Sequence, residues 1–201
     1  MASHIPSTMS FEHASVIPLC LSTAACGMFQ TEYLALQHPS LDPKPTGKTL
    51  IVWGGASSVG SNAIQLGVAA GYEVITTASS KNFEYVKKLG AGQAFDYHSN
   101  KIVDELVAAL KNKTIAGFID CIGQSGSWEA CADVALKSKG PKFIAASREP
   151  PKEIPEGVSS KFIMAYAIRD TEVSKVVYQD YLPRALAEGK FIAAPDPQVV
   201  G

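Results

Sequence analysis

The chain has 201 residues, of which 46% are hydrophobic and 18% are charged, and its formal net charge at pH 7 is −1. A chain of this length and composition can bury a sizeable core, which excludes intrinsic disorder and favours one domain of ordinary to large size. The nearly neutral charge provides no basic surface for nucleic acid or for an anionic membrane, so we expect a small molecule as the main partner.

The first residues lack the features of a targeting signal. Met1 to Pro6 contain no basic region followed by an apolar core, so no secretory signal is expected. The apolar stretch from Val16 to Phe29 is interrupted by Pro18, Ser and Thr, and it falls short of the roughly 18 uninterrupted apolar residues of a membrane span. We therefore expect a cytoplasmic protein with no membrane partner.

Residues 1–48 precede the regular part of the chain and are expected to form a helical linker segment. Ser10 has the position of an N-cap for a short helix, and the apolar run from Leu19 to Leu36 is long enough for one or two packed helices. A proline-rich loop over residues 39–47 leads to the first predicted strand. We expect residues 1–48 to pack on a domain formed by residues 49–201.

From residue 49 onward, short apolar runs alternate with amphipathic segments, a pattern typical of a parallel sheet covered by helices on both faces. The predicted strands are 49–53, 73–77, 93–96, 117–120, 142–146 and 160–166. The predicted helices are 58–70, 82–89, 101–110, 127–136 and a long helix over 171–187. Right-handed crossovers then predict a doubly wound Rossmann sheet in the order 3-2-1-4-5-6, within three α/β/α layers, whose ligand crevice lies at the carboxyl ends of the strands.

A glycine-rich loop links the first predicted strand to the helix that follows it. It reads G-x-G-x-x-G from Gly55 to Gly60, with Ser57 in the second glycine position. Such a loop lets backbone N–H groups approach a diphosphate, and the helix N-terminus adds its dipole. The loop therefore predicts a dinucleotide site, and we expect Gly60→Asp to abolish binding while leaving the fold nearly unchanged.

The second predicted strand ends in Ser79-Ser80-Lys81-Asn82, with no acidic residue where an NAD-specific site would bind the ribose. A carboxylate at that position accepts hydrogen bonds from a free 2′-hydroxyl and repels a 2′-phosphate. Hydroxyl, amide and ammonium groups favour the phosphate instead. This cluster predicts NADP(H) rather than NAD(H).

The cysteines and histidines do not indicate a metal site. Cys20, Cys26, Cys121 and Cys131 form neither a C-x-x-C pair nor a disulfide framework, and all but Cys121 are interpreted as buried small hydrophobic residues. The four histidines neither cluster in the sequence nor pair with Cys or an acid at metal-ligand spacing. We predict no metal ligand in the chain.

Several motifs together carry a resemblance to a known family. They are Leu21–Ala25, Gly54–Gly60, Lys87–Ala91 and Phe95–Tyr97. In this order and at this spacing, the chain resembles the medium-chain dehydrogenase/reductase superfamily of zinc-type alcohol dehydrogenase-like proteins over nearly its whole length. With the loop Gly54–Gly60, the run Ser79–Asn82 and the late Pro195–Pro197, it looks most like the fungal branch that holds trans-acting enoyl reductases and quinone-reductase-like proteins.

The resemblance implies roles for individual residues in binding the cofactor. The residues at the diphosphate would be Gly55, Ser57, Ser58, Val59 and Gly60, and those at the 2′-phosphate would be Ser79, Ser80, Lys81, Asn82 and Tyr97. Cys121 and Ile122 would lie beside the ribose, and Ala146 and Ser147 near the nicotinamide, although loop packing explains these four residues equally well. Thr23 would also lie near the nicotinamide, with a helix N-cap as the alternative interpretation.

The resemblance further implies that the chain is the cofactor domain of a longer oxidoreductase. A GroES-like catalytic domain would be absent from the 201 residues, so we expect the chain alone to be inactive. The leading function is hydride transfer from NADPH to an activated C=C bond of an enoyl or quinone-like small-molecule substrate. A zinc-dependent alcohol dehydrogenase with its metal ligands outside this chain and a non-catalytic dinucleotide-binding sensor stay open as alternatives. No proton donor is predicted, and a homo-oligomer is compatible with this interpretation.

Overall fold

The computed structural model describes residues 2–124 and 126–200. Its centre is a six-stranded sheet in the order β3-β2-β1-β4-β5-β6, with all neighbouring strands parallel. The predicted doubly wound Rossmann fold and its strand order are therefore confirmed. The strands are β1 (Lys48–Trp53), β2 (Glu73–Ala78), β3 (Gln93–Asp96), β4 (Thr114–Asp120), β5 (Phe143–Ala146) and β6 (Ser159–Phe162).

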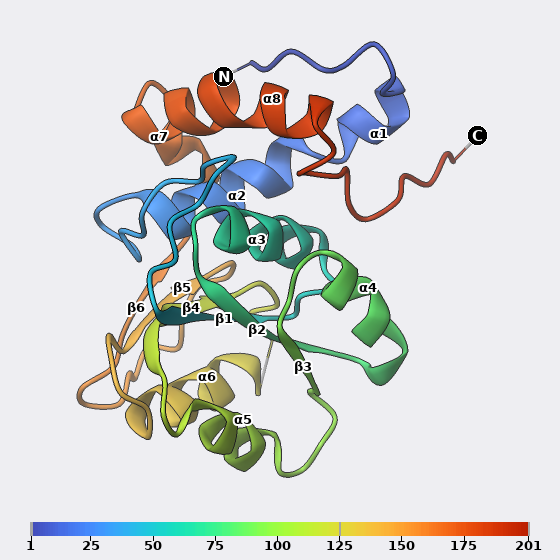
Figure 1. The fold of residues 1–201 in the computed structure, drawn as a ribbon. Helices are drawn as coiled ribbons and strands as arrows, with labels where there is room; N and C mark the ends of the chain where they lie inside the picture. The colour runs from blue at the N-terminus through green and yellow to red at the C-terminus, as the bar shows by residue number, and fades with distance from the viewer. Residues whose placement is uncertain (1, 125, 201) are drawn as a thin grey trace.

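Helices cover both faces of the sheet (Figure 1). On one face lie α1 (Phe11–Ser15), α2 (Pro18–Phe29), α3 (Ser58–Ala69), α4 (Phe83–Lys88) and the C-terminal helices, and on the other lie α5 (Ile102–Leu110) and α6 (Ser127–Leu136). Within β1, Leu50 and Val52 belong to the first core, whereas Ile51 and Trp53 belong to the second. Because successive side chains of a strand point to opposite faces, a strand covered on both sides is apolar throughout.

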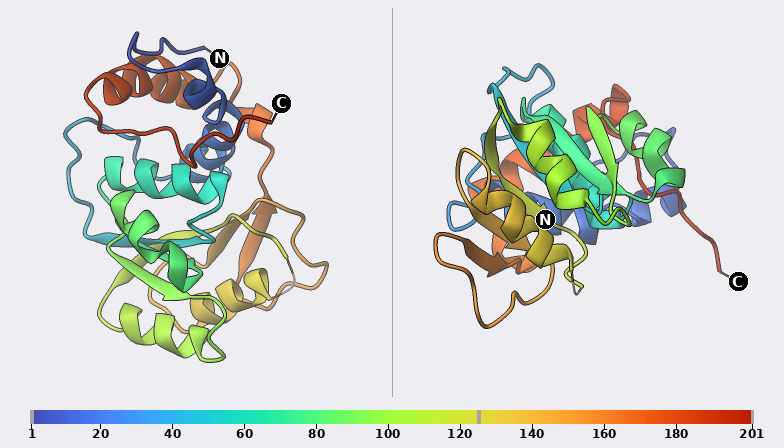
Figure 2. Two further views of the ribbon diagram at one scale, coloured as in Figure 1. Left: turned by 90° about the vertical axis from the view of Figure 1, so that its right-hand side faces the viewer. Right: turned by 90° about the horizontal axis from the view of Figure 1, so that it is seen from below.

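The helix α2 is enclosed by segments from both ends of the chain. Its residues from Leu21 to Phe29 are buried, apart from the half-buried Thr23. The hydroxyl of Tyr178 donates to the carbonyl oxygen of Pro18 at 2.9 Å and also hydrogen-bonds the hydroxyl of Ser22. Helix α2 and the C-terminal helical region around Tyr178 therefore pack together over one face of the sheet (Figures 1 and 2). No helix within the described ranges has the length and apolarity needed to cross a membrane.

The structure corrects several predicted boundaries. Strand β4 begins at Thr114, three residues earlier than predicted, and β6 ends at Phe162, after which the chain turns into the 3-10 helix η2 (Ala165–Ile168). The predicted long helix over 171–187 consists of α7 (Glu172–Lys175), the π-helical turn η3 (Val176–Tyr181) and α8 (Leu182–Ala187). Pro183 accounts for this widening, since its ring lacks an N–H and would clash with the carbonyl four residues earlier in a regular helix.

Candidate functional site

The order of the strands reverses at β1, between its neighbours β2 and β4. The chain passes from β1 to β2 and β3 on one side of β1, and then crosses back to β4 on the other side. In doubly wound sheets a ligand crevice forms outside the carboxyl ends of the strands at this position. The glycine-rich loop, which follows β1, lies at this switch point.

The loop between β1 and α3 presents backbone N–H groups without partners. Ser57 is the N-cap of α3, because its Oγ accepts the N–H of Gly60 at 3.1 Å, and the same hydroxyl donates to the carbonyl oxygen of Gly54 at 2.7 Å. The N–H groups that find no acceptor among the described residues are those of Ala56, Ser58 and Val59. Free N–H groups at the N-terminus of a 12-residue helix form a favourable anion site.

Gly60 is needed for close packing within the protein. A Cβ atom on Gly60 would lie 2.2 Å from the carbonyl oxygen of Gly54 and 2.8 Å from the Cα of Gly55. The expectation that Gly60→Asp would leave the fold nearly unchanged is therefore wrong, because any side chain here would push the first turn of α3 away from the end of β1. Gly55 is equally enclosed, since its Cβ would lie 2.2 Å from the Thr76 hydroxyl.

The polar cluster after β2 lies beside the end of β3. The strand register places Ala78 opposite Asp96, so Ser79–Asn82 and Tyr97 follow neighbouring strand ends. The Asn82 amide donates to the Ser79 hydroxyl at 3.1 Å, whereas Ser80 and Lys81 are exposed. Among the described residues Lys81 forms no ion pair. The structure therefore brings together all the residues predicted at the 2′-phosphate.

Asp96 and His98, which were not predicted as site residues, order the chain around Tyr97. The Asp96 carboxylate accepts a hydrogen bond from the backbone N–H of His98 at 3.0 Å. It also hydrogen-bonds the Nδ1 of the His98 ring at 2.8 Å. These donors hold the pKa of Asp96 below its ordinary value. The His98 ring lies 4.1 Å from the Tyr97 ring, centroid to centroid. An aspartate that bonds the N–H two residues later is a turn signal that the triplet Asp-Tyr-His contains.

A hollow of about 400 Å³ opens next to the glycine-rich loop. It is lined by Trp53, Gly54, Tyr97, Ile102, Ile122, Gln124, Gly126, Ser127 and Ala130. Gly54, Tyr97 and Ile122 come from the ends of three different strands, β1, β3 and β4. The hollow has the size and the largely apolar walls of a small-molecule pocket.

The remaining predicted residues lie at the ends of β4 and β5 and in α2. The Cys121 thiol is buried in the core, and burial raises its pKa well above the ordinary value. Its neighbour Ile122 lines the hollow. Ala146 is buried at the end of β5, and the N–H of Ser147 donates to the Asp120 carbonyl at 2.8 Å. Thr23 donates to the Leu19 carbonyl inside α2, so its interpretation as an N-cap is wrong.

Asp120 is a fully buried carboxylate that holds the loop after β4. Its Oδ1 accepts the N–H groups of Ile122 at 3.0 Å and Gly123 at 3.1 Å, and its Oδ2 accepts the Ser127 hydroxyl at 2.9 Å. Burial raises the pKa of Asp120 above its ordinary value, although these donors oppose the shift. The sequence signal for this role is an acidic residue that ends an otherwise apolar strand.

The raised pKa of Asp120 predicts a pH-dependent stability. The folded protein binds the carboxyl proton more tightly than the unfolded chain, so this contribution is fully present below the unfolded pKa near 3.8 and is lost as pH rises through the folded pKa. Asparagine does not titrate, so the free energy of unfolding of Asp120→Asn lacks this loss. As pH rises from the unfolded pKa to above the folded pKa, we expect the variant to gain stability relative to the wild type, and the difference then levels off. Chemical denaturation at several pH values measures this difference, and a difference independent of pH would contradict the prediction.

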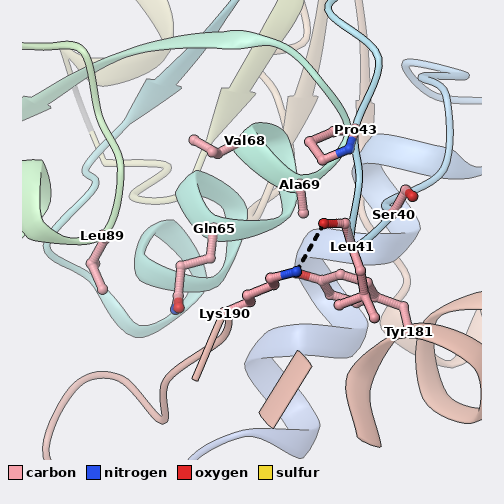
Figure 3. Close-up of a pocket in the computed structure, with 9 residues that line it drawn as sticks. All are labelled: Ser40, Leu41, Pro43, Gln65, Val68, Ala69, Leu89, Tyr181 and Lys190. Atoms are coloured by element: carbon pink, nitrogen blue, oxygen red, sulfur yellow. Dashed lines mark hydrogen bonds between the residues drawn. The ribbon is translucent and has the colours of Figure 1, made fainter. Parts of the chain in front are cut away.

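Other features lie away from this edge. A hollow of about 210 Å³ lies over the outer face of α3, toward the end of the helix that is remote from the glycine-rich loop. Figure 3 shows the residues that line it. It is bounded by the loop from Ser40 to Pro43 and by Lys190. In the part of the chain that the structure describes, no three His, Cys, Asp or Glu side chains gather as metal ligands.

Comparison with known proteins relates the chain to oxidoreductases. The model of the family described as zinc-binding dehydrogenase matches residues 58–171. A dehydrogenase of Aspergillus niger is 52% identical over 206 residues, which cover 100% of this chain and 59% of the relative. A trans-enoyl reductase of Aspergillus japonicus is 37% identical over 202 residues, which cover 100% of this chain and 58% of the relative. The chain thus spans about three fifths of the length of these curated relatives.

Solved structures show the same fold. The crystal structure of Escherichia coli quinone oxidoreductase complexed with NADPH matches 94% of this chain and 57% of its own chain, with a TM-score of 0.71. The two sequences are 18% identical. The likeness at this identity extends to the arrangement of strands and helices described above.

Proposed function

Because the chain belongs to the zinc-binding dehydrogenase family and is a cofactor-binding domain of the medium-chain dehydrogenase/reductase superfamily, we propose that it binds NADP(H). The enzyme would transfer hydride from NADPH to an activated C=C bond of an enoyl or quinone-like substrate. One observation carries the proposal. The free N–H groups of the glycine-rich loop and the polar cluster around Tyr97 lie along the same edge of the sheet. The similarity to a trans-enoyl reductase and to a quinone oxidoreductase complexed with NADPH supports it.

The two kinds of phosphate in the cofactor match two separate groups of donors. We assign the diphosphate to the N–H groups of Ser58 and Val59, where the dipole of α3 favours negative charge. We assign the 2′-phosphate to Ser79, Ser80, Lys81, Asn82 and Tyr97. The hollow lined by Gly54, Tyr97 and Ile122 offers apolar walls for the adenine ring.

The far end of the edge is assigned to the nicotinamide, which supplies the hydride when bound. The N–H of Ile163 donates to the Ala146 carbonyl at 2.8 Å, so the ends of β5 and β6 lie together there. Ser147 and Thr23 would orient the ring from this chain. We assign no proton donor to the described residues.

The substrate pocket is proposed to involve a further domain of the same protein. The curated relatives are longer than this chain, which supports a catalytic domain as its partner. Within the chain, we assign the residues before Lys48, which begins β1, to a helical segment that packs on the cofactor-binding domain. A full-length relative of this chain should then reduce an enoyl substrate with NADPH, and activity that disappears with a zinc chelator would instead support a zinc-dependent alcohol dehydrogenase.

The assignment of the 2′-phosphate predicts a preference for NADPH over NADH. This group carries close to two negative charges, and each charge-assisted hydrogen bond contributes about 1.5–3 kcal/mol before screening. Because Lys81 is exposed, we expect a net preference of about 2–3 kcal/mol, which is tens- to hundreds-fold in affinity. Fluorescence titration with both reduced cofactors at two salt concentrations measures the ratio.

Lys81→Ala should reduce this ratio by weakening NADPH and leaving NADH nearly unchanged. Lys137→Ala is the matched control, because this exposed lysine follows α6 at the opposite edge of the sheet. Equal affinities in the wild type, or a Lys81→Ala variant that weakens both cofactors alike, would show that the cluster does not bind the 2′-phosphate.

A further inference from the structure

The C-terminal segment of residues 191–195 runs along the outer face of α3 and is held there by Gln65. The Gln65 side-chain amide donates to the carbonyl oxygen of Ile192 at 3.1 Å, and its Oε1 accepts the N–H of the same residue at 2.8 Å. Figure 3 shows Gln65 projecting from α3, with Lys190 bonded to the Leu41 carbonyl just before the segment begins. A reciprocal pair of hydrogen bonds fixes the position and the direction of the segment.

Asn62 links the same segment to the first turn of α3. Its side chain is 1% exposed, and its Nδ2 donates to the carbonyl oxygens of Ser58 at 2.8 Å and Ala194 at 3.4 Å. The Oδ1 is buried with no partner among the described residues. The orientation of this amide follows from its neighbours, because turning it over would direct Oδ1 at two carbonyl oxygens.

Asn62 and its neighbour Ser61 orient the free N–H groups of the glycine-rich loop through the carbonyl groups of the same peptide units. The carbonyl of Ser58 shares a planar peptide group with the N–H of Val59, so fixing the oxygen also fixes the direction of the N–H. In the same way, the Ser61 hydroxyl donates to the carbonyl of Gly55 at 3.3 Å, whose peptide group carries the N–H of Ala56. Hydrogen bonds to a carbonyl also polarise the N–H of its peptide group.

From this geometry we propose that docking of residues 191–195 on α3 and binding of the dinucleotide phosphates strengthen each other, with Asn62 and Gln65 as positioning residues. The inference rests on the proposed function, since it requires the glycine-rich loop to bind those phosphates. Docking holds Asn62 against Ser58 and thereby orients the Val59 N–H. A phosphate bound to that N–H favours the same arrangement and so retains the segment.

Thermodynamic linkage makes the coupling measurable from both sites. A coupling of about tenfold lies within the usual range for two linked sites in one domain. Saturating NADPH should slow hydrogen exchange of the amides of residues 192–194 by about this factor. A change that releases the segment should weaken NADPH binding by the same factor, because the coupling is reciprocal.

The experiment compares Gln65→Met and Asn62→Ala with the wild-type chain, using hydrogen exchange with mass spectrometry and NADPH titration. Gln65→Met removes both bonds to Ile192 and keeps the length of the side chain, and Gln65 makes no hydrogen bond to the loop of residues 54–60. We expect faster exchange of the segment and about tenfold weaker NADPH binding in both variants. Val68→Ala, one turn along the same helix, is the matched control and should change neither quantity.

Two results would overturn the coupling. One is exchange of residues 192–194 that NADPH does not slow in the wild type. The other is a folded Gln65→Met variant that releases the segment and binds NADPH as tightly as the wild type does. A wild-type chain that binds no NADPH would contradict the proposed function itself, and the coupling with it.

Discussion

Replacing Gly60 with alanine is expected to lower the free energy of unfolding by about 3 kcal/mol and to weaken dinucleotide binding by tenfold or more. The new Cβ would lie 2.2 Å from the carbonyl oxygen of Gly54, far inside van der Waals contact. It would also lie 2.8 Å from the Cα of Gly55. Both of these neighbours are backbone atoms, so neither can rotate away. The first turn of α3 must move away from the end of β1, and the N–H groups of Ser58 and Val59 move with it.

Gly67→Ala provides a matched control within the same helix. A Cβ on Gly67 would meet the ends of two side chains, Val74 at 2.9 Å and Leu50 at 3.0 Å, which can shift. Alanine also favours the helix by about 1 kcal/mol over glycine. Chemical denaturation should therefore show a change within about 1 kcal/mol for Gly67→Ala. If Gly60→Ala were equally mild, the close packing of Gly60 against Gly54 would not limit this site.

Replacing Asp120 with alanine is expected to lower the free energy of unfolding by about 2–4 kcal/mol. The change leaves the N–H groups of Ile122 and Gly123 without their acceptor, whereas the Ser127 hydroxyl keeps the carbonyl of Gln124 at 2.9 Å. The loop after β4 then loses the bonds that fix Ile122 beside the hollow. We expect NADPH binding to weaken by about tenfold, which a titration at neutral pH measures.

Asp120→Asn separates the hydrogen bonds from the charge. The asparagine oxygen can still accept both N–H groups, and the side chain carries no charge to desolvate. At neutral pH this variant should retain stability and NADPH affinity close to those of the wild type. A loss as large as that of Asp120→Ala would mean that the charge of Asp120, and not its hydrogen bonds, holds the loop.

The sheet could be predicted from the sequence because its strands depend on local patterns. The apolar run of β1, the glycines that follow it and the amphipathic helix α3 all point to the same βαβ unit, and the handedness of its crossovers leaves few strand orders. The C-terminal helix was harder, since apolar periodicity continues through residues 171–187 while Pro183 disrupts its hydrogen bonds. The pattern predicts a helix but not the wider turn that accommodates the proline.

The candidate site was predictable at its strand ends but not in its supporting contacts. The loop of residues 54–60 and the cluster of residues 79–82 carry recognisable chemistry, and the order of strands brings them to one edge. Asp120 and Asn62 act through partners that only the folded chain brings near, such as the Ala194 carbonyl beside Asn62. Whether a side chain fits at position 60 likewise depends on how closely α3 approaches the end of β1 in the folded chain.

The enclosure of α2 also affects how the polypeptide reaches its folded state during synthesis. The hydroxyl of Tyr178 that bonds Pro18 comes from a residue 160 positions later in the chain. At about 5–20 residues per second, the ribosome needs roughly 8–30 s to make that stretch, and the apolar side of α2 waits for its cover during this time. Contacts of such long sequence separation also slow folding. Nascent chains stalled before Tyr178 should therefore recruit chaperones through α2 more strongly than chains released after it.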